Sequence, residues 1–228
     1  MAMTTLPRAL AALGLCLAVS GCADGLTDPP EALKPLAERL GLYTEPSRFE
    51  ASRAEIAATG IDAPLLRVVA REPVAQSAGY LLAQTTGGLD TYTANDGSLL
   101  FLRSGLLQGT IGFRQDLDGA SVAPVAAALD GGAARYDRLL RHRAGDGPLY
   151  ERMVACTLTP EGAEQIVILG RRHATTRHVE RCVAPAIDPA GRRLAFENLY
   201  WTEAGRLRAS EQWVSEGVGR LRIEQVLP

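Results

Sequence analysis

Hydrophobic and polar residues alternate in short runs from residue 65 to the end of the chain. Because successive side chains of a strand point to opposite faces, this alternation predicts strands with one buried face. Turn residues, among them the hairpin signal Asn95-Asp96-Gly97, separate the runs. The pattern favours a mainly β fold, an antiparallel meander forming a barrel-like or sandwich body. Before the C-terminal region, the predicted strands cover residues 65–70, 78–84, 89–94, 99–103, 106–113, 149–158, 164–170 and 175–184.

The last 37 residues, 192–228, predict a three-stranded meander. Two breaks, at 203–205 and 216–219, contain the glycine that tight turns favour. Each segment between them has an apolar row on one parity, which predicts one face turned to the core. These rows are Leu194, Phe196 and Tyr200, then Leu207, Ala209 and Trp213, then Leu221, Ile223 and Leu227.

Helical signals are confined to a few short stretches. Leu33, Leu36 and Leu40 have helical spacing and predict a helix over 31–42. Ser52 precedes a helix-forming run with Glu55 three residues later, which is the capping-box pattern. Residues 122–129 fit a helical turn around a proline, and periodicity leaves 133–141 open between helix and strand.

The N-terminus has the features of a secretory signal that ends at a cysteine. Arg8 is followed by an apolar run and then by the small residues before Cys22, too short a run to span a membrane. The arrangement is similar to a bacterial lipoprotein signal, in which Cys22 is lipidated; an ordinary signal peptide is the alternative. We therefore divide the chain into a signal peptide (1–21), a tether (22–30) and one mainly β domain (31–228). Ala23, rather than Asp, follows the cysteine, which in Gram-negative lipoproteins implies the outer membrane.

Charge and cysteine usage narrow the classes of function. The formal net charge is −2 and the arginines are dispersed, so no basic footprint for nucleic acid is expected. If Cys16 leaves with the signal and Cys22 is lipidated, Cys156 and Cys182 remain in an oxidising compartment. We predict a disulfide between them that joins two strands; two reduced buried thiols are the alternative.

Candidate catalytic and metal-binding groups are sparse. His173 and His178 lie in a stretch expected to form a turn between strands, with no nucleophile motif beside them. The run that begins at Asp116 resembles the start of a calcium loop without the later ligands, and a loop with local hydrogen bonds fits better. Glu197 and Glu211 could face each other across two strands, which is the arrangement of paired carboxylates that a glycosidase needs. No catalytic residue, metal or cofactor is predicted.

Two polar features of the meander remain as binding hypotheses. Aromatic faces with amides at their edges suit sugars. The aromatic and amide side chains of the meander are therefore a candidate glycan or partner platform, although packing in the core is the simpler interpretation. Asn198, Glu211 and Gln225 lie on the otherwise apolar parity, which predicts a hydrogen-bonded network or a cavity. The platform would consist of Asn198, Tyr200, Trp201, Gln212 and Trp213.

Two patches of sequence resemble the group 4 capsule polysaccharide lipoprotein family, GfcB or YjbF. One has Asn198, then Tyr200-Trp201, then Ser210-Glu211-Gln212-Trp213 after a turn glycine; the other is the glycine-rich run 105–113 followed by Asp116-Leu117. The resemblance implies an outer-membrane lipoprotein facing the periplasm, with a barrel-like fold and a part in exopolysaccharide or capsule export. It implies no enzymatic activity.

The combined prediction is a non-catalytic accessory of polysaccharide production or export, held in the membrane by a lipid anchor. Its partners would be a polysaccharide or an outer-membrane export protein, and not nucleic acid. Two alternatives remain at this point: a periplasmic lipid or lipoprotein carrier with an apolar cavity, and a periplasmic glycan-modifying enzyme.

Overall fold

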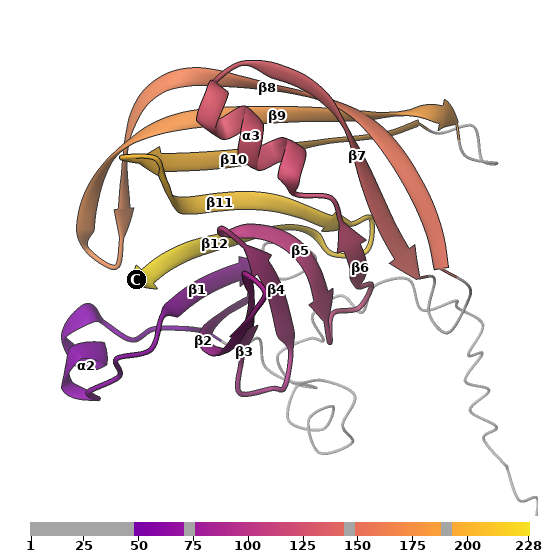
Figure 1. Cartoon of the computed structure of the whole chain (residues 1–228). Helices are drawn as coiled ribbons and strands as arrows, with labels where there is room; N and C mark the ends of the chain where they lie inside the picture. The colour runs from indigo at the N-terminus through magenta and orange to yellow at the C-terminus, as the bar shows by residue number, and fades with distance from the viewer. Residues whose placement is uncertain (1–47, 71–75, 144–148, 188–192) are drawn as a thin grey trace, which may run out of the picture. The chain divides into compact units, whose positions relative to one another are not determined.

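The computed structural model describes residues 48–70, 76–143, 149–187 and 193–228. Cys22, the tether and the predicted helix over 31–42 lie outside these ranges. Two helices and twelve strands occur within them (Figure 1). The helices are α2 (Arg53–Ala58) and α3 (Ala123–Gly131). The strands are β1 (Leu65–Ala70), β2 (Gln76–Thr86), β3 (Leu89–Thr93), β4 (Leu99–Arg103), β5 (Leu106–Ile111), β6 (Leu117–Ala120), β7 (Ala134–Arg143), β8 (Leu149–Ile168), β9 (Arg171–Ile187), β10 (Arg193–Glu203), β11 (Arg206–Ser215) and β12 (Gly219–Leu227).

All twelve strands belong to one antiparallel sheet that curls into a nearly closed barrel, which confirms the predicted fold class (Figure 1). The order is β5-β4-β3-β2-β1-β12-β11-β10-β9-β8-β7-β6, so β5 and β6 are the two edges. The edges meet through side chains, because the Leu117 amide donates to Thr110 Oγ1 at 2.9 Å. An added Cβ at Gly109 would lie 3.2 Å from the Leu117 carbonyl oxygen. A glycine in β5 therefore lets the two edges approach closely.

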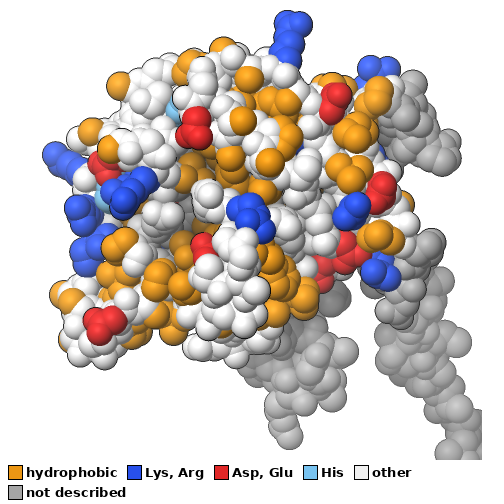
Figure 2. Space-filling view, in the orientation of Figure 1, with side chains coloured by type: hydrophobic (Ala, Val, Ile, Leu, Met, Phe, Trp, Pro, Cys, Tyr) orange, Lys and Arg blue, Asp and Glu red, His pale blue; other side chains and the backbone are white. Residues whose placement is uncertain are grey.

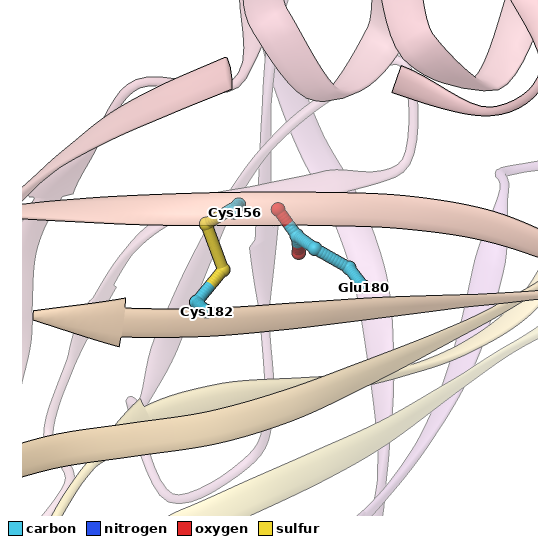
Figure 3. A group of neighbouring side chains, drawn as sticks. All are labelled: Cys156, Glu180 and Cys182. Carbon is cyan, nitrogen blue, oxygen red and sulfur yellow. A yellow bond between two sulfur atoms is a disulfide. The ribbon is translucent and has the colours of Figure 1, made fainter. Parts of the chain in front are cut away.

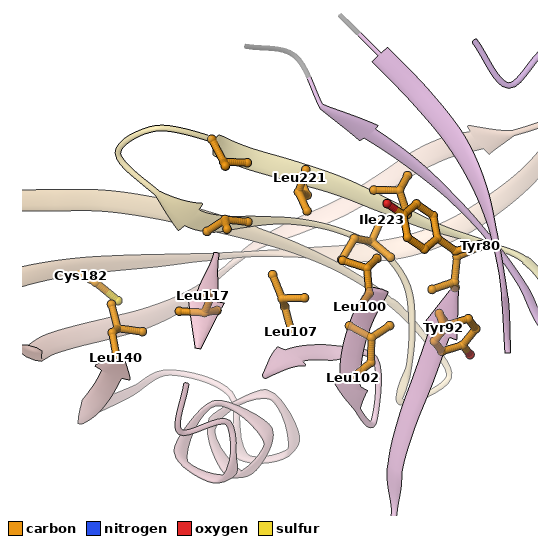
Figure 4. Close-up of a cluster of buried hydrophobic side chains, with 14 of the residues drawn as sticks. Tyr80, Tyr92, Leu100, Leu102, Leu107, Leu117, Leu140, Cys182, Leu221 and Ile223 are labelled. Atoms are coloured by element: carbon orange, nitrogen blue, oxygen red, sulfur yellow. The ribbon is translucent and has the colours of Figure 1, made fainter. Parts of the chain in front are cut away.

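The barrel interior is filled by hydrophobic side chains from every part of the sheet (Figure 4). Leu100 and Leu221 are fully buried, and Tyr80 and Tyr92 pack against the same cluster. Helix α3 places Val125 against Leu158 and Tyr200, where it covers part of the sheet. A cavity near Tyr92 and Ile223 has a volume of about 40 Å³, little more than one water molecule occupies.

Helix α2 forms where the capping box predicts it. Ser52 Oγ accepts from the Glu55 amide at 3.2 Å, and a Glu55 carboxylate oxygen accepts from the Ser52 amide at 2.7 Å. Both contacts satisfy amides that the first turn of a helix leaves unpaired. Ile56 then packs into a second hydrophobic cluster that contains Trp201 and Ile168. No helix in the described ranges combines the length and apolarity that a membrane crossing requires.

Three sequence expectations need correction or completion. The segment 133–141, for which periodicity did not decide between helix and strand, falls almost entirely in strand β7 (Ala134–Arg143). The two strands expected over 149–158 and 164–170 are one long strand, because the chain passes Pro160 and Gly162 through a register shift without turning. The segment expected to form a turn, with His173 and His178, lies inside β9, and the turn comes earlier at Leu169 and Gly170, both with positive φ.

The C-terminal meander is confirmed as β10, β11 and β12. The predicted inward row is correct for Leu221 and Ile223 of β12 and for Trp213 of β11, which all pack in or against the inner cluster. It is wrong for Ala209 and Leu227, which pack in the outer cluster around Trp201, and it misses Val214, the fully buried core side chain of β11. Polar side chains occupy part of the inner face of β11, and their hydrogen bonds to buried groups explain why they are stable there.

Candidate functional site: the polar interior and the hollow between β10 and β11

Glu180 of β9 is the centre of a buried polar network. Its side chain is fully buried and forms a salt bridge with Arg138 of β7, whose guanidinium nitrogen lies 2.8 Å from Glu180 Oε2. The hydroxyl groups of Tyr136 and Tyr200 donate to the same carboxylate at 2.8 and 2.7 Å. The Asn198 amide donates to it at 2.6 Å. Four side chains from two strands, β7 and β10, thus satisfy one buried carboxylate, as buried charge requires.

The electrostatics of this network favour the observed charge states. Burial raises the pKa of the Tyr200 hydroxyl, and the negative charge of Glu180 raises it further. Burial works against a charged Arg138, but Glu180 and the two tyrosines together outweigh it, so its pKa is raised. Two neutral phenols and one guanidinium therefore face the carboxylate at any physiological pH.

The predicted disulfide is present directly beside Glu180 (Figure 3). Cys156 and Cys182 are opposite each other in the β8–β9 ladder, and both are buried. The two sulfurs and a Glu180 oxygen lie within 4.8 Å of one another, a spacing that could suit a metal ion. Sulfurs joined to each other are not thiolates, however, and cysteine binds metals as the thiolate. We therefore interpret this trio as a structural core.

Gln212 and Asn198, two predicted platform residues, hold parts of the barrel together from inside. Gln212 Oε1 accepts from the Leu107 amide at 2.8 Å, and Gln212 Nε2 donates to the Gly105 carbonyl oxygen at 3.2 Å. Gln212 thus satisfies backbone groups at the start of edge strand β5. Asn198 Oδ1 accepts from the Trp213 amide at 2.6 Å. Neither side chain is exposed to a ligand.

Trp201 and Tyr200 are also buried, so four of the five platform residues do not form an exposed surface. Trp201 is 4% exposed and packs in the outer cluster, with the Arg222 guanidinium 4.9 Å above its ring. Tyr200 is fully buried at Glu180. Of the inward polar residues, Asn198 is in the network, while Gln225 lines the small cavity near Tyr92.

Trp213 is the platform residue that lines a surface hollow, at a place where two strands separate. The β10–β11 ladder ends at the pair Leu199–Glu211. Beyond it, β10 continues beside β9 and β11 continues beside β12. The opening has a volume of about 450 Å³. It is lined by Ala195, Phe196, Glu197, Glu211, Trp213, Gly219, Arg220 and Arg222.

An aromatic pair and four charged side chains give this hollow its chemistry. The rings of Phe196 and Trp213 stack with centroids 4.6 Å apart and planes 13° from parallel. Glu197 pairs with Arg181 at 2.7 Å, and Arg222 pairs with Glu211 at 3.2 Å. Glu197 and Glu211 thus line the same hollow, as the enzyme alternative requires, but each is engaged by an arginine.

The histidines have structural surroundings. His142 stacks on Tyr150 and makes a T-shaped contact with Trp213, and its Nε2 donates to the Val214 carbonyl oxygen at 2.7 Å. Burial lowers the pKa of His142. His173 contacts Glu203 at 3.3 Å.

The run that begins at Asp116 is a locally bonded loop. Asp116 accepts from the Thr110 hydroxyl and from the amides of Gly112 and Phe113. Its carboxylate is occupied by these neighbours, in agreement with the loop interpretation.

Sequence reasoning missed Glu180, Arg138 and Phe196 as members of these sites. A signal for Glu180 was available, because it has the same parity as Cys182 in a strand where that parity faces inward. Arg138 could not be found in this way, since its partner lies 42 residues away in the chain.

Comparison with known proteins identifies the family. The model of the family described as group 4 capsule polysaccharide lipoprotein gfcB, YjbF matches residues 41–226. No curated protein matches the chain. The solved structure of the lipoprotein YmcC from Escherichia coli K12 superimposes with a TM-score of 0.66 at 15% identity, covering 89% of this chain and 98% of that one. This likeness supports the fold.

Two further solved structures are more distant. A lipoprotein from Parabacteroides distasonis has a TM-score of 0.32 at 8% identity, covering 73% of this chain and 95% of that one. An exported protein with a YmcC-like fold from Bacteroides fragilis has a TM-score of 0.30 at 11% identity, with coverage of 72% and 93%. The match to the family model extends over most of the sequence and includes both motif patches. The chain belongs to the group 4 capsule polysaccharide lipoprotein family.

Proposed function

We propose that this lipoprotein is a non-catalytic accessory of exopolysaccharide or capsule production or export, which acts by binding the glycan or an export-channel partner. The observation that carries the proposal is the family match over residues 41–226. The fold likeness to the lipoprotein YmcC supports it.

The proposed location is the periplasmic face of the outer membrane, with acyl chains on Cys22 as the anchor. Each buried methylene contributes about 0.8 kcal/mol to membrane binding, so a multiply acylated terminus is a durable anchor. Metabolic labelling with a radioactive fatty acid such as palmitate tests the attachment point. The wild type should be labelled and Cys22→Ala should not; equal labelling of both would contradict the anchor.

The alternatives receive less support from the described residues. A lipid carrier requires a large apolar cavity, whereas hydrophobic side chains fill the barrel interior around Leu100 and Leu221. A glycan-modifying enzyme would use the carboxylates of Glu197 and Glu211, which instead form salt bridges with Arg181 and Arg222. A binding role asks only for an accessible surface.

Deletion of the gene tests the proposed pathway. The amount or chain length of surface polysaccharide should change, and the wild-type gene supplied in trans should restore it. The Cys22→Ala variant, produced at the same level, should restore it poorly because the protein is no longer held at the membrane. Unchanged polysaccharide in the deletion strain would contradict the proposal.

A further inference from the structure

We infer that the hollow between β10 and β11 binds a saccharide that carries a carboxylate, with stacked rings below the sugar and Arg220 facing the acidic group. The inference rests on the proposed function, since it names the ligand class for a protein that we propose to act in polysaccharide production or export.

The hollow is a built feature of the meander. Where the ladder stops after Leu199–Glu211, the Asn198 side chain bonds to the Trp213 amide and so satisfies a backbone group that the missing ladder would have paired. Asn198 is itself held by Glu180 at 2.6 Å. The buried network therefore fixes the position of the strand segment that carries Trp213. A fixed separation of strands provides a preformed concave site.

The aromatic pair supplies a surface suited to a sugar ring. Phe196 and Trp213 are each half-buried and hold one another in a stacked geometry. The rings of His142 and Trp213 are in T-shaped contact, with centroids 5.3 Å apart. Such side chains give a large, rigid and partly apolar contact area that costs little conformational entropy on binding. One face of a pyranose ring is similarly flat and partly apolar.

The charges of the hollow favour an acidic ligand. Its two carboxylates, on Glu197 and Glu211, are engaged by Arg181 and Arg222. Arg220 is exposed, and its guanidinium has no hydrogen bond or ion pair with any described residue. The planar fork of a guanidinium matches a carboxylate in a bidentate arrangement. With the other charged side chains of the hollow engaged in ion pairs, Arg220 is the one that is available to bind a ligand.

A second group of exposed basic side chains is the alternative binding site for an acidic saccharide on this protein. Figure 2 shows blue side chains gathered at the left of the molecule, where the β8–β9 hairpin lies. Arg171 and Arg172 of this hairpin are exposed. No stacked aromatic pair accompanies them among the described residues, so they offer charge without a surface for the sugar ring.

Titration calorimetry with tetragalacturonate, a saccharide with four carboxylates, tests the inference. The wild type should bind it, and Arg220→Ala should weaken binding by about tenfold or more, because a charge-assisted hydrogen bond is lost. Arg135→Ala, which removes an exposed arginine from the outer face of β7, is the matched control and should bind like the wild type. Maltotetraose and a short polyglutamate, which carry the sugar or the charge alone, should bind more weakly.

Several outcomes would overturn the inference: no binding by the wild type, equal binding of maltotetraose or polyglutamate, or an equal loss in Arg220→Ala and Arg135→Ala. A loss in Arg171→Ala with none in Arg220→Ala would move the site to the hairpin and also overturn it. Complementation of the deletion strain separates this failure from failure of the proposed function. If wild-type and Arg220→Ala genes restore polysaccharide equally, the hollow is dismissed while the pathway role stands.

Discussion

The two sides of the β10–β11 segment differ in how completely their charges are paired. On the inner side, Glu180 accepts from Arg138, Asn198 and two tyrosines, and no solvent reaches it. At the hollow, by contrast, the Arg220 side chain faces solvent without a partner among the described residues. A fully satisfied buried network stabilises one conformation, whereas an unpaired exposed charge beside aromatic rings can contact a ligand. Of the residues that identify the family, Asn198 and Tyr200 belong to the buried network, whereas Glu211 and Trp213 line the hollow.

Removal of Glu180 should have the largest effect. Glu180→Ala leaves the Arg138 guanidinium buried without its partner, so the free energy of unfolding should fall by about 3–5 kcal/mol. Urea denaturation measures this. The control is Glu197→Gln, which breaks the exposed pair with Arg181 and should change the free energy by about 1 kcal/mol or less. Similar losses in both variants would contradict the distinction between the two sides.

Loss of the disulfide should have the next largest effect. The bond between Cys156 and Cys182 closes a loop with a sequence separation of 26, for which the chain-entropy model gives about 3.5 kcal/mol. A Cys156→Ala/Cys182→Ala variant should lose that amount in urea denaturation, and wild type with the bond reduced should match it. A variant as stable as the oxidised wild type would show that the disulfide contributes nothing to the free energy of unfolding.

Gln212→Ala should have a smaller effect with a local signature. It leaves the Leu107 amide and the Gly105 carbonyl without their partner, at a cost of about 1–3 kcal/mol. Hydrogen exchange of the Leu107 amide should quicken. Gln165→Ala, an exposed position of β8, is the matched control and should stay within about 0.5 kcal/mol. If Leu107 exchange is unaffected in Gln212→Ala, Gln212 does not fasten β5.

Acid should destabilise the protein modestly through His142. Burial lowers its pKa from 6.5, and its Nδ1 is buried without a hydrogen-bond partner among the described residues. As pH falls below 6.5, the unfolded chain binds a proton that the folded chain resists, so the free energy of unfolding falls.

Between pH 7 and pH 5 the free energy of unfolding should therefore fall, with the resisted protonation of His142 as one source of the loss. Urea denaturation of His142→Gln at both pH values should show a smaller drop than the wild type. Burial also lowers the pKa of His178, which should leave part of the drop in place. An unchanged pH dependence would exclude His142 as its source.

The sequence predicted what depends on local chemistry. The Ser52–Glu55 capping box, the turns of the meander and the cysteine pair are encoded in neighbouring residues, strand alternation or compartment. The inner face of β11 could not be predicted, because its polar side chains have partners in β5 that are about a hundred residues away. The separation of β10 from β11 depends on strand register, which alternation alone does not fix.

The most direct test of the account maps tetragalacturonate binding onto both regions at once in the unmodified protein. Backbone amide shifts should be recorded by NMR during a titration with the saccharide. The account predicts that the largest changes fall on residues 195–197, 213 and 219–222 around the hollow, with small changes at Arg138 and Glu180. Shifts concentrated at Arg171 and Arg172, or spread evenly over the barrel, would contradict the assignment of the hollow as the ligand-facing surface.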